Sequence, residues 1–458
     1  MLFFPTADED FQYFRSQGYT GSINDMHYKA MGDLGYTGSL NDRIHAYLVN
    51  TYGNFYEAMR GLRNGTLTFS LSSYIVNGFD PDLVFDFEKN YYRTGGTDST
   101  LSSSITHTRA SSATMVNSSG NIVTVGNNVA RTGHHIYNGS AWVNEGILHE
   151  SEARTNIVKY SEDFTVGGLN WLLTNVTVTA SSVVSPDGET NAYELDMNSG
   201  GFMRTLTGHV PSVGDTYTAS IWLKAGTLST VGLSLLFSGS GLGEITETLT
   251  LTNEWQRFHI ASTVPSGTPD QVRMRVKTLT QTGSILAFGA QIEAGSTPSS
   301  YIPTSGSQVT RAAETLSVPA ANLPYSSTNM SIQMDGKMTG NNLTHIRWFE
   351  DADDAILLET GTNNFTFTQE AGGTVDTVTG GSFTSGNLLA FNTASRHGSG
   401  FINGAISGTA LTANTTPSAL PDLADNNLVL GYDYMGTISK FRMWDEDLTD
   451  AGIEEAST

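Results

Sequence analysis

The residues that could do chemistry are spread along this sequence, and none of them completes a catalytic motif. His149 and Glu150 begin like the His-Glu-x-x-His helix of zinc proteases, but the second histidine is missing. His134 and His135 are adjacent, and on a strand their side chains would point to opposite faces. The serine elbow of hydrolases and the phosphate-binding Gly-Lys loop are absent from the sequence. Glycosidases need two carboxylates about 5 to 9.5 Å apart, and no spacing singles out such a pair. We therefore expect that the protein is not an enzyme.

Acidic side chains could supply oxygen ligands to a calcium ion at two places. Asp351, Asp353 and Asp354 fall within one short run, and Asp445-Glu-Asp447 forms a second run near the C-terminus. A chain with a net charge of −22 also carries acids in its loops simply because they keep it soluble. Both explanations stay open. We name Asp351, Asp353 and Asp354 as the candidate metal ligands and expect no other cofactor.

Tryptophan rings are the candidates for sugar binding, because a flat amphipathic ring offers a sugar's apolar face a large contact area. Trp348 is followed by Phe349 and then by the acidic run, which places it beside an expected loop. We predict that Trp348 is an exposed platform for stacking a sugar. Trp222 and Trp255 lie in alternating, strand-like segments, and we interpret them as core residues.

The composition narrows the possible partners. Charged residues make up 15% of the 458 positions, against about 25% in a typical soluble protein. Much of the polarity comes from Ser, Thr, Asn and 48 glycines. The net charge of −22 argues against binding to nucleic acid or to an anionic membrane. The sequence has no cysteine, which excludes disulfides and thiolate metal sites.

The N-terminal residues give an expectation about the compartment. Residues 1–10 carry no Lys or Arg and soon turn acidic, unlike a secretory signal. No apolar run approaches the roughly 20 residues that span a bilayer. We expect the protein to be made in a cytoplasm, without membrane insertion, and to stay there or leave as part of an assembly.

Residues 1–65 have the periodicity of short helices. The segment Gly-Tyr-Thr-Gly-Ser-Ile-Asn-Asp at 18–25 recurs at 35–42 with one change, a tandem repeat with a period of 17 residues. The Ser-x-x-Asp spacing in each copy is typical of a helix N-terminus. A small aromatic core is one interpretation; the other, which we favour, is that so few helices cannot hide this many aromatic rings alone. We predict a docking domain that a partner completes through Phe11, Phe14, Tyr19, Tyr36, Tyr47 and Phe55.

The rest of the chain has the short alternating segments of β structure. Residues 66–150 are expected to form an irregular β connector with a hairpin at Asn138-Gly139. Residues 151–308 and 309–458 are expected to form two β-sandwiches of the jelly-roll or lectin-like type. In the second we predict a hairpin turn at Asn403-Gly404 and a final helix capped by Thr449. The predicted fold class is mainly β, with a small N-terminal helical anchor.

Several of these segments, taken together, resemble a widespread group of tailed-bacteriophage virion proteins, the tail fibres, minor tail proteins and head fibres. The resemblance runs from about residue 10 to 314, and its carriers are the N-terminal repeat and residues 85–88, 106–114, 152–156, 160–164, 255–258, 289–295 and 301–304. Two of these stretches, 152–164 and 288–313, bracket the first sandwich. Residues 330–458 are similar, more loosely, to concanavalin-A/laminin-G-like modules through 401–404 and 438–444.

The resemblance implies a virion protein that assembles in the bacterial host cytoplasm and forms a homotrimer. Its N-terminus would attach to other virion proteins of the tail, baseplate or capsid, and its sandwiches would face outward and bind host-surface glycans. Laminin-G-like modules often hold one calcium ion, whereas the phage group has no shared catalytic residues. The favoured function is a tail fibre that presents lectin-like modules for host adsorption. The alternative is a head fibre or capsid decoration protein with a purely structural role.

Overall fold

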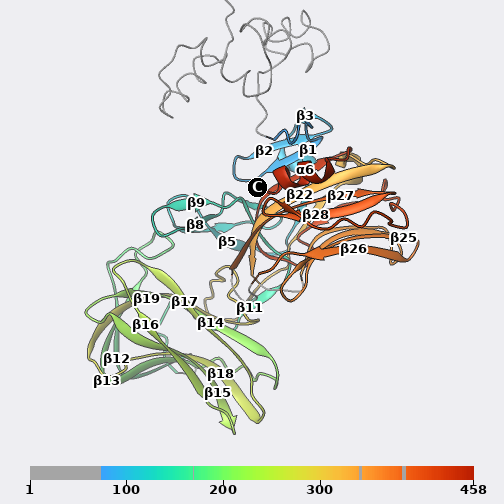
Figure 1. The fold of residues 1–458 in the computed structure, drawn as a ribbon. Coiled ribbons are helices and arrows are strands. Elements are labelled where there is room, and N and C mark those ends of the chain that lie inside the picture. The colour runs from blue at the N-terminus through green and yellow to red at the C-terminus, as the bar shows by residue number, and fades with distance from the viewer. Residues whose placement is uncertain (1–73, 169, 340–342, 384–387) are drawn as a thin grey trace, which may run out of the picture. The chain divides into compact units, whose positions relative to one another are not determined.

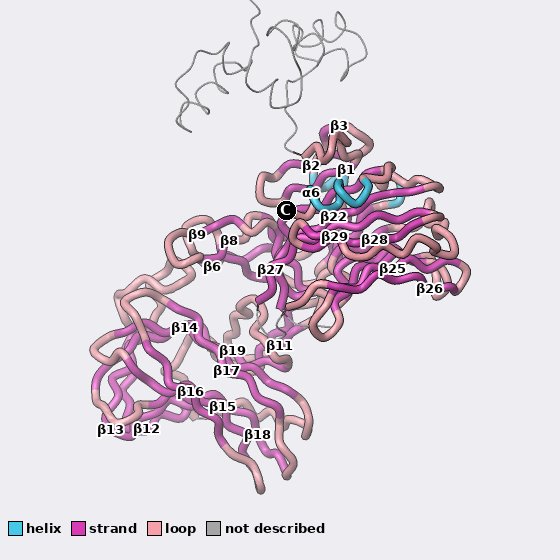
Figure 2. Tube along the Cα trace, viewed as in Figure 1, coloured by secondary structure: helices cyan, strands magenta, loops and turns pink. Residues whose placement is uncertain are grey.

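The computed structural model describes residues 74–168, 170–339, 343–383 and 388–458. The chain divides into two units, Met1–Ser73 and Tyr74–Thr458, of which only the second is described. The predicted docking domain therefore lies outside the described residues, together with its six aromatic residues Phe11, Phe14, Tyr19, Tyr36, Tyr47 and Phe55. The described unit is mainly β, as predicted, and Figure 2 shows how little of it is helical. None of its helices is long and apolar enough to cross a membrane.

Two sheets share one core and form what is called here the outer sandwich (Figure 1). In the described chain, the first sheet has ten strands. Eight of them follow the order β29 (Thr409–Ala410), β28 (Phe401–Ile406), β27 (Leu388–Gly398), β22 (Asn329–Thr339), β31 (Met435–Trp444), β1 (Leu83–Asp86), β2 (Tyr91–Thr94) and β3 (Thr97–Asp98). The other two are β10 (Ile147–Glu150), which pairs with β31, and β7 (Arg131–Thr132), which pairs with β10.

The second sheet of the outer sandwich has seven strands among the described residues. Its order is β26 (Thr374–Gly380), β25 (Phe365–Ala371), β24 (Ala355–Thr360), β23 (Thr344–Phe349), β30 (Leu428–Leu430), β21 (Thr315–Val318) and β4 (Thr106–Thr108). Phe85 and Phe441 face each other across β1 and β31, and they share a buried cluster with Phe367 of the second sheet. Both sheets therefore bury their inner faces against each other, as expected for a sandwich.

Residues 157–308 fold around a separate core and form what is called here the inserted sandwich. Its strand order is β16 (Glu244–Thr250), β15 (Thr230–Ser240), β18 (Thr268–Lys277), β13 (Tyr193–Thr205), β19 (Gly283–Ala294), β14 (Thr216–Ala225) and β17 (Gln256–Thr263). Strand β12 (Trp171–Ala180) pairs with β13. The alternation of apolar and polar residues predicts strands that bury one face, such as β18. Strands β14, β15 and β19 are instead buried along most of their length.

Strand β13 joins the two halves of the inserted sandwich. Its first half, up to Met197, pairs with β19, and its second half, from Phe202, pairs with β18. The bend between them needs glycine. Gly200 has a φ of +71°, and a Cβ on Gly201 would lie 2.7 Å from the carbonyl oxygen of Asn175. The bend in β13 is therefore possible because Gly200 and Gly201 have no side chains.

The inserted sandwich interrupts the outer sandwich in the sequence. Strands β1 to β4 precede it and β21 to β31 follow it, yet both groups build the same two sheets. The two crossing segments pair with each other as β11 (Arg154–Asn156) and β20 (Val309–Arg311), with Asn156 opposite Val309. The predicted connector 66–150 and the predicted sandwich 309–458 therefore share sheets. Sequence periodicity identifies the strands but does not show which distant strand each one joins.

Short elements complete the described chain. Hairpins β5–β6 (Ala113–Val116, Ile122–Val125) and β8–β9 (His135–Tyr137, Trp142–Asn144) lie outside the large sheets, and the second turns at Asn138-Gly139 as predicted. The helices are α5 (Leu101–Ser104), η1 (Ala320–Asn322) and α6 (Thr449–Ala456).

Two local predictions are wrong. Asn403 and Gly404 lie inside strand β28 and are buried, and the turn is at residues 399–400 instead. A Cβ on Gly404 would lie 2.2 Å from the ring of Phe367, so this glycine serves close packing and not a turn. Thr449 does not cap α6, because its φ is +64° and its own N–H donates to Asp447 Oδ1.

Candidate functional site

The predicted sugar platform, Trp348, is wrong. Its side chain is 0% exposed. The indole Nε1 donates a hydrogen bond to the carbonyl oxygen of Asn426 at 2.8 Å, and the ring of Tyr325 packs edge-on against it at 6.0 Å. Alternation along β23 puts Trp348 on the inner face of the sheet. A fully buried ring has no face to offer to a sugar.

The predicted calcium ligands Asp351, Asp353 and Asp354 lie in the loop between β23 and β24. The oxygens of Asp351 and Asp354 accept hydrogen bonds from the backbone N–H groups of Asp353 and Gly372. Among the described residues, these three carboxylates are not brought together as a possible metal group. Asp351 and Asp354 thus have the local role of turn-stabilising aspartates.

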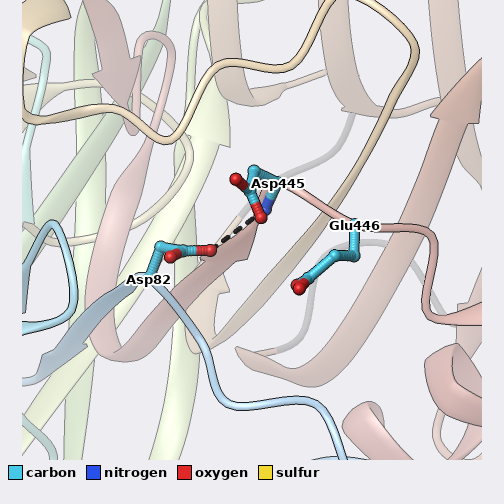
Figure 3. Close-up of side chains that lie close together, drawn as sticks. All are labelled: Asp82, Asp445 and Glu446. Atoms are coloured by element: carbon cyan, nitrogen blue, oxygen red, sulfur yellow. Dashed lines mark hydrogen bonds between the residues drawn. The ribbon is translucent and has the colours of Figure 1, made fainter.

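A different acidic group forms where the start of β1 meets the end of β31. Asp82, Asp445 and Glu446 offer oxygens within 4.8 Å of one another. Figure 3 shows their side chains, with the backbone N–H of Asp445 donating to Asp82 Oδ2 at 3.2 Å. Burial, together with the charge of Asp445, raises the pKa of Asp82. Exposed acidic groups of this kind are common without an ion, and no metal site is assigned here.

Glu150 belongs to a buried group of charges, called here the ion cluster, that consists of Arg109, Arg131, Glu150, Arg311 and Glu314. Arg131 donates to Glu314 Oε2 at 2.6 Å and to Glu150 Oε2 at 2.8 Å. Arg109 donates to Glu314 Oε1 at 2.5 Å, and Arg311 lies 3.0 Å from Glu150 Oε2. Arg109, Arg131 and Glu150 come from the connector, and Arg311 and Glu314 come from the segment that follows the inserted sandwich. The cluster thus ties together the segments that cross between the two sandwiches.

The charges of the cluster determine its ionisation. Burial would raise the pKa of Glu150, but Arg131 and Arg311 hold it at about 2. Arg131 and a contact with His107 likewise hold the pKa of the buried Glu314 far below its usual range. Burial lowers the pKa of His149 to about 4. Both carboxylates are ionised and their oxygens are occupied, so the cluster has the character of a structural junction and not of a catalytic pair.

A pocket of about 550 Å³, called here the aromatic pocket, lies beside the ion cluster. Its walls come from the hairpins β5–β6 and β8–β9, from β14, β17 and residues 298–301 of the inserted sandwich, and from β22 and β31 of the outer sandwich. Five aromatic side chains line it: Tyr137, Trp142, Trp222, Trp255 and Tyr301.

Two of these rings are exposed and two others are held by neighbours. Tyr137 and Trp142 are opposite each other across the β8–β9 hairpin, are 53% and 41% exposed, and have ring centroids 5.3 Å apart. A Cβ on Gly120, in the β5–β6 turn, would lie 2.3 Å from the Trp142 ring, so this turn packs closely against the indole. Trp255 donates through Nε1 to the carbonyl oxygen of Val184 at 2.8 Å. Trp222 meets Tyr301 edge-on at 5.1 Å.

Polar groups lie between the rings. His134, His135, Gln256, Arg257 and Lys337 line the pocket. Burial, with the charge of Arg131, lowers the pKa of His134 to about 4, so the ring is neutral near pH 7. Its Nδ1 accepts a hydrogen bond from the backbone N–H of Val116 at 3.1 Å. Aromatic faces combined with a few fixed polar groups are the usual composition of a small-molecule site.

Sequence reasoning missed most of this pocket. Trp222 and Trp255 were expected in the core, but both are only partly buried and line the pocket. Tyr137 and Trp142 flank the four-residue turn 138–141 symmetrically and lie opposite each other across the hairpin. A four-residue turn centred on Gly139 and Ser140 would have identified the pair from the sequence. The meeting of this hairpin with β14 and β17 has no local signal in the sequence.

No protein family and no curated protein sequence matches the chain. Solved structures match locally. Tailspike protein 4 of bacteriophage CBA120, in its enzymatically active domain, has a TM-score of 0.26 and 16% identity over 31% of this chain and 21% of that chain. The IT-sialidase CBM40 of Ruminococcus gnavus with α2,6-sialyllactose has a TM-score of 0.25 and 12% identity over 29% of this chain and 85% of that chain. Domain 4 of a Geobacillus stearothermophilus arabinanase with arabinotriose has a TM-score of 0.26 and 16% identity over 32% of this chain and 73% of that chain. Similarity at this level does not assign a function.

Proposed function

We propose that the protein is a tail fibre of a tailed bacteriophage and that its aromatic pocket binds a glycan of the host surface. The observation that carries the glycan part is the pair of exposed rings, Tyr137 and Trp142, in a pocket that also holds hydrogen-bonding side chains. A sugar ring has one apolar face and a rim of hydroxyl groups. Rigid amphipathic rings can pack against that face, and the polar side chains can bond to the rim.

Removing an exposed ring tests the glycan part of the proposal. Trp142→Ala should reduce binding of the full chain to its best ligand on a host-glycan array by roughly tenfold or more, since a buried aromatic contact contributes about 1.5–3 kcal/mol. Tyr432→Ala is the matched control, because Tyr432 is also exposed, at 49%, but does not line the pocket. Equal binding by both variants, or no binding by the natural chain, would refute the proposed site.

The virion part of the proposal is supported by the resemblance of residues 10–314 to phage virion proteins. A chain that docks through residues 1–65 and forms a trimer would raise the effective concentration of weak single sites. Phage particles assembled with a chain that lacks residues 1–65 should not carry it, and particles that retain it would contradict this docking assignment.

We also propose that the protein binds its glycan without cleaving it. Release of reducing sugar from host polysaccharide by the purified chain would overturn that part. A purely structural head fibre or decoration protein is the outcome if host glycans do not bind but the chain is found on particles.

A further inference from the structure

One cation in the aromatic pocket makes no salt bridge with any described residue, although the charges of Glu293 and Glu150 act on it from a longer distance. Arg257 of β17 is opposite Trp222 of β14, and its guanidinium lies over the indole at 4.5 Å from the ring centroid. It donates to the carbonyl oxygen of Ser299 at 2.7 Å and to Ser220 Oγ at 3.0 Å. An arginine has five N–H groups, so these two bonds leave donors unused. The Nε atom is buried and has no hydrogen-bond partner within the described chain.

The other charges that line the pocket are already paired. Lys337 is bonded to Glu145 at 2.5 Å, and Glu150 is held by Arg131 and Arg311 in the ion cluster. Among the described residues, no carboxylate oxygen lies within 4.0 Å of the Arg257 guanidinium. Nearby, Glu293 accepts hydrogen bonds from Ser299 and Gln291 instead. The pocket therefore holds one positive charge that its own side chains do not neutralise by contact.

Resting on the glycan function proposed above, we infer that the aromatic pocket selects sugars that carry a carboxylate, with Arg257 as the residue that binds it. The planar guanidinium fork matches the two oxygens of a carboxylate, and its hydrogen bonds to Ser299 and Ser220 hold it in place over Trp222. Gln256, which is exposed and adjacent, provides an amide for the hydroxyl groups beside that carboxylate. The rings of Tyr137 and Trp142 pack on the sugar itself.

Because the chain as a whole is acidic, a preference for acidic sugars must have a local origin. At a net charge of −22 the protein repels polyanions at long range. That repulsion is screened beyond about 8 Å at physiological ionic strength, whereas the contact with Arg257 is made within the pocket. A preference for acidic sugars would thus come from one guanidinium and not from a basic surface.

The sharpest test changes the ligand and leaves the protein intact. The full chain is titrated with oligosaccharides that contain glucuronate, galacturonate or sialate residues, each paired with its methyl ester. The ester keeps the shape and removes the charge. We expect at least one acid to bind roughly tenfold to a hundredfold more tightly than its ester, as for a charged hydrogen bond. If every ester binds as tightly as its acid, the inference is wrong.

Variants of Arg257 then test whether this residue provides the positive charge that binds the carboxylate. Arg257→Met should remove the preference for the acid and keep the binding of the ester, and Arg257→Lys should restore only part of the preference, because an ammonium lacks the fork. Arg347→Met is the matched control. That guanidinium also lies over aromatic rings, of Phe349 at 3.9 Å and Tyr432 at 4.2 Å, but outside the pocket. A preference that survives in Arg257→Met would overturn the assignment.

The outcomes separate the inference from the proposed function. Binding of neutral and acidic glycans with equal affinity, lost in Trp142→Ala, keeps the glycan site and refutes the role of Arg257. Absence of binding to any glycan in the panel or on a host-glycan array refutes both. If Arg257→Met does not fold, the comparison of acid with ester on the natural chain still decides.

Discussion

At the scale of single residues, the ion cluster gathers several buried hydrogen bonds on one carboxylate, that of Glu314. Glu314 accepts from Arg109 and Arg131 and from the backbone N–H of Glu150. Replacing Glu314 by Gln would leave three buried guanidinium groups, those of Arg109, Arg131 and Arg311, with the carboxylate of Glu150 as the one negative charge in the cluster. We expect Glu314→Gln to lower the free energy of unfolding by about 3–5 kcal/mol, measured by urea denaturation.

The control for this variant is an ion group near the surface. Glu244 bridges Arg275 at 2.6 Å and Lys277 at 3.0 Å, and all three side chains are partly exposed. Because water can replace its contacts, Glu244→Gln should cost less than about 1 kcal/mol. If the two variants lose the same amount of stability, the ion cluster is not the junction that its burial indicates.

A second residue-scale prediction concerns Gly404. Its added Cβ would overlap the ring of Phe367 at 2.2 Å, and Phe367 is buried in the core. Gly404→Ala should therefore destabilise the protein by about 1–3 kcal/mol through overpacking. Gly400→Ala, in the neighbouring turn where a Cβ would meet nothing within 4 Å, should be close to neutral. The prediction is checked by thermal unfolding of both variants. If Gly400→Ala destabilises the protein more than Gly404→Ala does, the close packing of Gly404 against Phe367 is not what matters at this position.

At the scale of elements, the outer sandwich depends on strands from both ends of the described chain. β1 pairs with β31, and β4 pairs with β21, across the whole inserted sandwich. A chain that stops at residue 308 would lose those partners. We expect limited proteolysis of such a chain to degrade residues 83–150 and to leave residues 157–308 intact, because their core is separate.

The reciprocal deletion serves as the control. Asn156 and Val309 are opposite each other in β11 and β20, so a short turn can replace residues 157–308. The shortened chain should keep the outer sandwich, although it loses the two hydrogen bonds that Ser300 donates to Glu150. Protection of 83–150 in the chain that ends at 308 would show that these strands need no C-terminal partner.

The sequence predicts elements far better than it predicts their partners. The alternation in β23 and β30 gives their bounds directly, since apolar period-two segments bury one face. The resemblance motifs at 106–114 and 152–156 supply Arg109 and the Asn156 side chain, which bonds to four backbone groups. The bracketing stretch 288–313 supplies Arg311. Their role is structural here. Arg257 and Trp142 meet only through the fold, so no local pattern indicated the pocket.

At the scale of the whole molecule, buried titratable groups make stability depend on pH. Burial lowers the pKa of His134 and His149 to about 4 and that of His345 and His397 to about 3. An unfolded histidine takes up a proton near pH 6.5. Between pH 6.5 and these values the unfolded chain binds more protons than the folded chain, so stability falls as the pH falls. Glu150, with its pKa lowered to about 2, adds a loss below about pH 4.5.

Several carboxyls act in the opposite direction, because burial raises the pKa of each of them: Asp82, Glu88, Glu162, Glu293, Asp335, Asp433 and Glu446. Burial raises the pKa of Asp335 to about 6, so the folded chain takes up this proton before the unfolded chain does. Its contribution to stability therefore increases as the pH falls from about 6 to about 4. These carboxyls offset part of the effect of the four histidines. The net expectation is a protein that is most stable near neutral pH and loses stability toward pH 4.

His345 provides the clearest test of this expectation. Its ring lies among those of Phe365, Phe391 and Tyr434, and neither ring nitrogen has a hydrogen-bond partner among the described residues. His345→Phe removes the titrating group from an apolar cage. The slope of unfolding free energy against pH should decrease by about 1.4 kcal/mol per pH unit between pH 6 and 4, measured by urea unfolding. Phe391→Leu, a truncation in the same cage, should lower stability equally at every pH. An unchanged slope in His345→Phe would mean that this imidazole takes up its proton in the folded protein as readily as in the unfolded chain.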